Sequence, residues 1–190
     1  MEIYEQIKAY RPWNEQERQD QAVILAFLDK NPDAFYRTNL LAHMTASAWV
    51  VNPQRSKVLM VYHRLYDSWS WAGGHADGEE DLLAVALREV REETGVQCLR
   101  PVTEEIYSLE VLTVDGHEKH GRYVPSHLHL NVTYLLEADP AAPVRNRPGE
   151  NSRVAWFPLE EAVAASSEPW FRERIYQKLN AKLAGFPPGV

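Results

Sequence analysis

The sequence predicts an α/β (α+β) domain with a helical extension at its N-terminus. Three features favour this fold class: a strand hairpin over residues 46–62, a glycine-containing loop over 69–78, and a strongly periodic helix over 79–94. Further strands and two closing helices follow. We expect the extension to occupy residues 1–36 and the domain residues 37–190, because no long linker divides the chain.

Composition excludes several classes of protein. The chain has 190 residues, 45% of them hydrophobic and 25% charged, so a sizeable core is expected and general disorder is not. Its single cysteine, Cys98, excludes an internal disulfide and a cysteine-based zinc cluster. The formal net charge of -7 argues against stable nucleic-acid binding through a broad basic face. No apolar run approaches the ~20 residues of a membrane span, and the first residues do not resemble a secretory signal. We therefore expect no membrane partner and a cytoplasmic location.

The extension at residues 1–36 is polar and favours helix. Asn14 followed by Glu17 has the spacing of an N-terminal capping box, and Asn31-Pro32 ends the helix that follows. An apolar stripe at helical spacing lies between them: Val23, Ile24, Phe27 and Leu28. We expect this stripe to pack on the domain or on a partner subunit, which makes a homodimer plausible. A separate ligand-binding role for the extension is the alternative.

Local signals place the other elements in chain order. Residues 46–51 and 57–62 alternate like strands around the turn at Asn52-Pro53, which predicts a hairpin. The polar residues 115–126 are expected to form a hairpin loop. The remaining strands and helices are expected over 104–114, 127–136, 154–157, 159–165 and 169–184.

The helix over 79–94 carries the chemistry. Glu89, Glu92 and Glu93 lie within an arc of roughly 100°, in the helical half where the macrodipole disfavours anions. The like-charged pair at i,i+4 costs further stability. A hard divalent cation such as Mg²⁺ would remove these penalties, and Arg88 is placed to pair with Glu92 at i+4. A solvated acidic face is the alternative.

The loop before this helix strengthens the metal-binding interpretation. Gly73-Gly74 allows a tight backbone path near the acids, where a carbonyl could serve as a further ligand. The segment from Gly74 to Val96 then resembles the Nudix box, G-x5-E-x7-R-E-U-x-E-E-x-G-U, where U is a bulky aliphatic residue, at every defined position. Seven fixed identities at roughly 6% each coincide by chance in about one placement in 10⁸ to 10⁹. Ala72 is a small departure, since many Nudix proteins have proline there.

The resemblance spans about residues 44–184 and implies a Nudix-type α/β/α sandwich with a mixed central sheet. It also implies Mg²⁺-dependent hydrolysis of a phosphoanhydride in a nucleoside diphosphate linked to another moiety, or in a related small-molecule diphosphate, with Mn²⁺ as a substitute ion. By the family pattern Glu89, Glu92 and Glu93 bind the metal with the Gly73 carbonyl.

The same pattern assigns supporting roles. Gly74, Glu80 and Gly95 are structural positions of the box, and Glu80 and Arg88 orient the catalytic acids by salt bridges. The general base is either a box glutamate, with Glu89 and Glu93 the catalytic candidates, or an acid on a distant loop. Glu150 resembles such a loop acid, although an exposed loop carboxylate is equally ordinary there.

Substrate recognition is the least specified part of the sequence, because no substrate subgroup of the family is matched. His127, His129 and Asn131 alternate on one face of a predicted strand. They either contact substrate or face solvent, and metal binding by the two histidines would need a third ligand. His63, Arg64 and Trp69 flank the glycine loop and are further substrate-binding candidates, although packing in the core is the commoner fate of an aromatic side chain.

Two other functions compete with hydrolysis. A Nudix-fold module that senses a nucleotide without cleaving it would be expected to lose box acids, and here all are present. A Nudix-fold isomerase of isoprenoid diphosphates would need a catalytic cysteine before the box, whereas Cys98 follows it. The sequence therefore favours the hydrolase, with the sensing module as the alternative.

Overall fold

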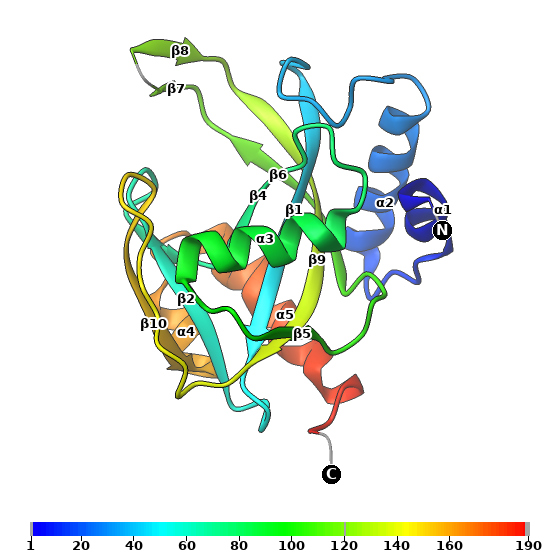
Figure 1. Cartoon of the computed structure of the whole chain (residues 1–190). Coiled ribbons are helices and arrows are strands. Elements are labelled where there is room, and N and C mark those ends of the chain that lie inside the picture. Colours follow the sequence, from blue (N-terminus) through cyan, green and yellow to red (C-terminus); the bar gives the residue numbers. More distant parts are fainter. Residues whose placement is uncertain (1, 120, 189–190) are drawn as a thin grey trace. The chain divides into compact units, whose positions relative to one another are not determined.

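Strands and helices are interleaved along the chain, as an α/β fold requires. The computed structural model describes residues 2–119 and 121–188 (Figure 1). Eight strands form a mixed sheet in which β10, β2, β1, β9 and β5 are neighbours in that order, while β3 pairs with β2, β4 with β1 and β6 with β9. This confirms the predicted α/β fold class. Among the described residues, no helix is both long and apolar enough to cross a membrane.

The chain divides into two compact units, and four elements contribute residues to both: β1 (Ala42–Val51), β4 (Ala72–His75), α3 (Leu82–Thr94) and β9 (His127–Ala138). The first unit comprises Met1–Ser47, Gly73–Ala86 and Glu105–Tyr134. The second comprises Ala48–Ala72, Leu87–Glu104 and Leu135–Val190. Each unit is described by itself below.

In the first unit the N-terminal helices pack together and α2 packs against a strand (Figure 1). Its other elements are α1 (Ile3–Ala9), α2 (Glu15–Leu28), β6 (Ser108–Val114), β7 (His117–Lys119) and β8 (Arg122–Val124). The β6 strand pairs antiparallel with β9, from Ser108 opposite Thr133 to Val114 opposite His127. Of the predicted stripe on α2, Ile24 is fully buried but Val23 is 47% exposed.

The start of α2 is fixed by a polar cluster that reaches β6. The Asn14 side chain accepts a hydrogen bond from the Glu17 backbone N–H at 3.0 Å, which is the predicted cap. The Glu17 carboxylate accepts from the Trp13 N–H at 2.7 Å, the Tyr10 hydroxyl at 2.6 Å and the Ser108 hydroxyl of β6 at 2.7 Å. Glu17 is fully buried, so this cluster ties α2 to the sheet.

In the second unit β2 lies between β10 and β1 and also pairs with β3, all antiparallel. The elements are β2 (Lys57–His63), β3 (Ser68–Ser70), β5 (Leu99–Pro101), β10 (Asn151–Pro158), α4 (Leu159–Ala165), the π-helical turn η1 (Phe171–Tyr176), α5 (Gln177–Lys182) and the 3₁₀ turn η2 (Leu183–Gly185). Trp49 and Tyr176 stack in its core with ring centroids 5.3 Å apart, and both side chains are fully buried.

Several predicted boundaries are wrong for identifiable reasons. The box helix begins at Leu82 and not at residue 79, because the Asp81 side chain accepts from the Ala84 N–H at 3.0 Å and caps the helix there. The first strand begins at Ala42, since all ten of its residues are buried and it lacks the alternation that marks a half-exposed strand. The loop over 69–78 contains β3 and β4, and the loop over 115–126 contains β7 and β8.

Candidate active site

The last two turns of α3 carry three carboxylates, which differ in how deeply they are buried. The Glu93 residue is only 4% exposed, the Glu89 side chain is 14% exposed and the Glu92 side chain is 41% exposed. An adjoining side of the helix is anchored by the fully buried Val90. One helix end therefore presents a set of oxygen donors that runs from the protein interior to the surface.

A single arginine from a distant loop joins the box acids to a further carboxylate. Nη1 of Arg147 lies 2.7 Å from Oε2 of Glu92 and 3.0 Å from Oε2 of Glu150. The structure thus brings the predicted loop acid beside the partner of a box glutamate. The predicted Arg88–Glu92 pair is wrong, because Arg88 instead contacts Glu89 at 3.3 Å and Arg147 takes Glu92.

The backbone at the end of α3 is held by the same loop. The Asn151 side-chain amide donates to the carbonyl of Glu93 at 2.9 Å, and the Arg145 N–H donates to the carbonyl of Thr94 at 2.8 Å. These bonds satisfy carbonyls that a helix leaves open at its C-terminus. Gly95 follows with φ +76°, and a Cβ there would lie 2.4 Å from Cγ of Arg145. The acids consequently sit on a fixed helix end.

The electrostatics of this helix end favour a bound cation. Burial raises the pKa of Glu89, and the neighbouring Glu92 raises it further, while Arg88 and Arg147 oppose the shift. The helix macrodipole also disfavours negative charge at the C-terminus of α3. A divalent cation would offset both effects, and carboxylate oxygens are the ligands that Mg²⁺ prefers.

The glycine loop belongs to the first unit, and Gly73 of β4 is packed tightly there. A Cβ at this position would lie 2.5 Å from Oγ of Ser47 and 2.7 Å from the carbonyl oxygen of Ala46. Only glycine allows this close approach of β4 to β1. Gly74, which follows, is half-buried.

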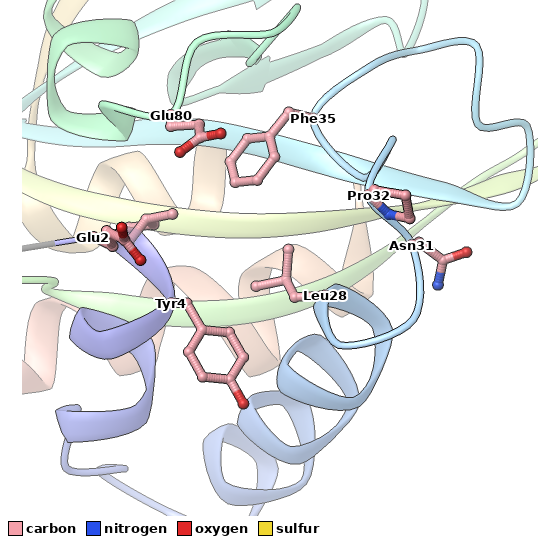
Figure 2. A pocket seen from close by; sticks show the side chains of 8 residues that line it. Glu2, Tyr4, Leu28, Asn31, Pro32, Phe35 and Glu80 are labelled. Atoms are coloured by element: carbon pink, nitrogen blue, oxygen red, sulfur yellow. The ribbon is translucent and has the colours of Figure 1, made fainter.

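Glu80 is exposed and precedes α3. With Glu2, Tyr4, Leu28 and Phe35 it lines a hollow of about 230 Å³ in the first unit (Figure 2). Its predicted role in orienting the catalytic acids stays a prediction.

Two of the predicted substrate-binding residues lie next to Glu150. The Arg64 N–H donates to the carbonyl of Glu150 at 3.3 Å, and His63 is paired with Asn151 across β2 and β10. Arg64 is exposed, so its guanidinium is available to an anion. These residues extend the surface around the loop acid.

Trp69 is engaged by protein groups. Its ring meets Phe157 edge-on with centroids 4.8 Å apart, and the Arg153 guanidinium lies 5.1 Å from its centroid. The same guanidinium lies 4.2 Å from the ring of Tyr62. Trp69 is therefore part of a packed cation–π cluster.

The polar face of β9 is covered within the first unit. His127 is 9% exposed, and Asn131 is 1% exposed and accepts hydrogen bonds from the hydroxyls of Thr45 and Ser47 at 2.9 and 2.8 Å. The interpretation of this face as solvent-exposed is thus wrong. Nε2 of His127 lies 3.2 Å from Nε2 of His129. Sequence reasoning missed that His43 and His75 join this pair, because the four residues come from three separate segments; the only local signal was His75 directly after the glycine pair.

Comparison with known proteins agrees with this geometry. A model of the NUDIX domain matches residues 41–179. No curated protein gives a significant match. Among solved structures, the chain is similar to an Ap4A hydrolase from C. elegans in a binary complex, with 22% identity, 75% of this chain and 98% of that chain covered, and a TM-score of 0.55. It is also similar to the dihydroneopterin triphosphate pyrophosphohydrolase from E. coli, with 16% identity, 71% of this chain and 92% of that chain covered, and a TM-score of 0.53. A third similar structure is a NUDIX hydrolase from Nitrosomonas europaea, with 19% identity, 77% of this chain and 92% of that chain covered, and a TM-score of 0.51.

The fold and the acidic end of α3 define a domain of the Nudix class, and the solved structures above share this fold. The chain belongs to the Nudix family, and its enzymatic class is that of the Nudix pyrophosphohydrolases.

Proposed function

We propose that this protein is a Mg²⁺-dependent hydrolase that cleaves a phosphoanhydride bond in a nucleoside diphosphate linked to another moiety, or in a related small-molecule diphosphate. One observation carries the proposal: Glu89, Glu92 and Glu93 share the last two turns of α3, and Arg147 bridges Glu92 and Glu150. A diphosphate is itself strongly anionic, so an acidic site accommodates it only through cations.

The residues of this helix end fit a divalent ion. Their donors are hard carboxylate oxygens, and the raised pKa of the buried Glu89 marks a site where negative charge lacks compensation. We propose Glu89, Glu92 and Glu93 as the protein ligands, with the Gly73 carbonyl as a further one and Mn²⁺ as a substitute ion. When bound, the ion supplies charge neutralisation and a water of lowered pKa.

The other residues support this set. Arg88 orients Glu89 through the 3.3 Å contact. The general base is a box glutamate, Glu89 or Glu93, or the loop acid Glu150, which is exposed enough to reach solvent. Gly74, Glu80 and Gly95 shape the backbone of the box.

The exposed guanidinium of Arg64, beside Glu150, suits the substrate's phosphates. Arg64 and His63 lie next to Glu150, and we propose them as substrate contacts, with Trp69, His127 and His129 as further candidates.

We also propose that the protein is cytoplasmic and has no membrane partner and no stable nucleic-acid partner. A homodimer through α2 is supported by the 47% exposure of Val23. The extension at 1–36 and the domain at 37–190 remain the proposed organisation.

Product release from a panel of compounds tests the proposal. The panel contains dinucleoside polyphosphates, nucleoside and pterin triphosphates, nucleotide sugars, dinucleotides, and inositol and isoprenoid diphosphates, each with Mg²⁺, Mn²⁺ or EDTA. Glu93→Gln is compared with Glu160→Gln, which changes an exposed glutamate of α4. We expect metal-dependent turnover of one compound, lost only in Glu93→Gln. Tight binding of a compound without turnover would favour the sensing module instead.

A further inference from the structure

Four histidine rings gather in the first unit. His43 on β1, His75 on β4 and His129 on β9 each offer a ring nitrogen, and these three atoms all lie within 4.8 Å of one another. The ring centroids are 5.1 Å apart for His43 and His75, 5.1 Å for His43 and His129, and 4.9 Å for His75 and His129. His127 stacks on His43 at 4.9 Å.

Hydrogen bonds on the far side of two rings set their tautomers. Nδ1 of His43 lies 3.1 Å from the carbonyl oxygen of Asn39, and Nδ1 of His127 lies 2.8 Å from that of Pro125. A carbonyl only accepts, so each Nδ1 carries the proton and each neutral ring turns an Nε2 lone pair toward the cluster. A ring proton donated to a carbonyl is the arrangement that supports metal-binding histidines.

The Nε2 atom of His43 provides a second, independent observation. His43 is only 4% exposed, and this atom is buried without a hydrogen-bond partner among the described residues. An unsatisfied buried acceptor destabilises the folded protein. A metal ion at the centre of the cluster would take up this lone pair.

We propose that His43, His75 and His129 bind one first-row divalent transition-metal ion, best matched by Zn²⁺, at a site separate from the carboxylate site. Three imidazole nitrogens suit Zn²⁺ and its neighbours, whereas Mg²⁺ prefers oxygen. Zn–N bonds of about 2.0–2.1 Å place tetrahedral ligands about 3.4 Å apart, so the three rings draw closer on binding. His127 lies beside this group, with its Nε2 atom 3.2 Å from Nε2 of His129.

Direct measurement of bound zinc tests this site without any substrate. The purified full chain is stripped with a chelator, dialysed against Zn²⁺, and analysed for metal content; Co²⁺ absorption then reports the ligand field. We compare His129→Gln and His75→Gln with His63→Gln, a histidine of the second unit. Glu89→Gln serves as the control for the carboxylate site.

We expect one Zn²⁺ per chain in the wild type, His63→Gln and Glu89→Gln. Binding should weaken by about 100-fold or more in His129→Gln and His75→Gln, since even losing an outer-shell partner costs ~10–100-fold. Circular dichroism of the stripped proteins checks that each is folded, and the half-buried His75 is the safer substitution if His129→Gln is not. The absence of bound Zn²⁺ in the wild type, or equal Zn²⁺ content in all variants, would overturn the proposal.

Discussion

Replacing Arg147 by glutamine should tighten divalent-cation binding at the end of α3. The Arg147 guanidinium lies 2.7 Å from Glu92 and 3.0 Å from Glu150, so a cation that takes Glu92 as a ligand has to displace it. Arg147→Gln removes the competing ion pair. It also removes a positive charge close to the cation, and both effects act in the same direction.

The size of the effect follows from the exposure of the two groups. The Arg147 side chain is 38% exposed and that of Glu92 is 41% exposed, so their ion pair belongs to the surface class. Such pairs contribute about 0.2–1 kcal/mol. Converted at about 1.4 kcal/mol per tenfold, this predicts a Kd lower by roughly 1.4-fold to 5-fold.

Mn²⁺ is a suitable probe, because electron paramagnetic resonance measures the free ion directly during a protein titration. The titration is made in a His129→Gln background, so that binding by the histidine cluster is not counted. Arg91→Gln, which removes the same charge from α3 without affecting the Arg147 ion pair, is the matched control.

A Kd that is unchanged or raised in Arg147→Gln would refute this reasoning, since Glu92 would then either not bind the ion or need Arg147 to position it. An equal decrease in Arg91→Gln would attribute the effect to net charge alone.

Three further outcomes are expected. Gly73→Ala should lower the free energy of unfolding in urea by about 1–3 kcal/mol, because the new Cβ would lie 2.5 Å from Oγ of Ser47; a change near zero would contradict this packing. Glu137→Gln should cost about 3–5 kcal/mol in the same assay, since it removes the partner of the buried Arg55, whereas Arg100→Gln should cost about 1 kcal/mol or less because that side chain is 72% exposed. Burial alone would raise the pKa of Glu137, but hydrogen bonds from both arginines outweigh it and lower the pKa. The wild type therefore keeps this stabilisation above pH ~4.3 and loses it as the pH falls through the lowered pKa. The stability gap to Glu137→Gln should narrow in acid, and urea unfolding at several pH values measures it.

Features of the fold that depend on neighbouring residues were predictable. The Asn14 cap and the acids of α3 depend on spacing within one helix, and both are where the pattern places them. The start of α3 was not predictable, because Glu79, Glu80 and Asp81 are successive acids, and the sequence does not say which one caps the helix. In the structure Asp81 does so.

The candidate site divides in the same way. The spacing of Glu89, Glu92 and Glu93 follows from helix geometry alone. The partner of Glu92 depends on where the loop before β10 lies, and an arginine at i−4 was the nearest candidate in sequence, yet Arg147 takes that place. The histidine cluster was missed for the same reason, since β1, β4 and β9 become neighbours only after folding.

The buried Glu17 makes the N-terminal helices an internal part of the molecule. Its carboxylate is held by Tyr10, Trp13 and Ser108, and it is fully buried. A chain shortened to start at residue 37 would expose the face of β6 that α2 covers and would leave Ser108 without Glu17 as a hydrogen-bond acceptor. Such a truncated protein should aggregate on purification, so the predicted boundary at residue 36 is unsuitable for a truncation.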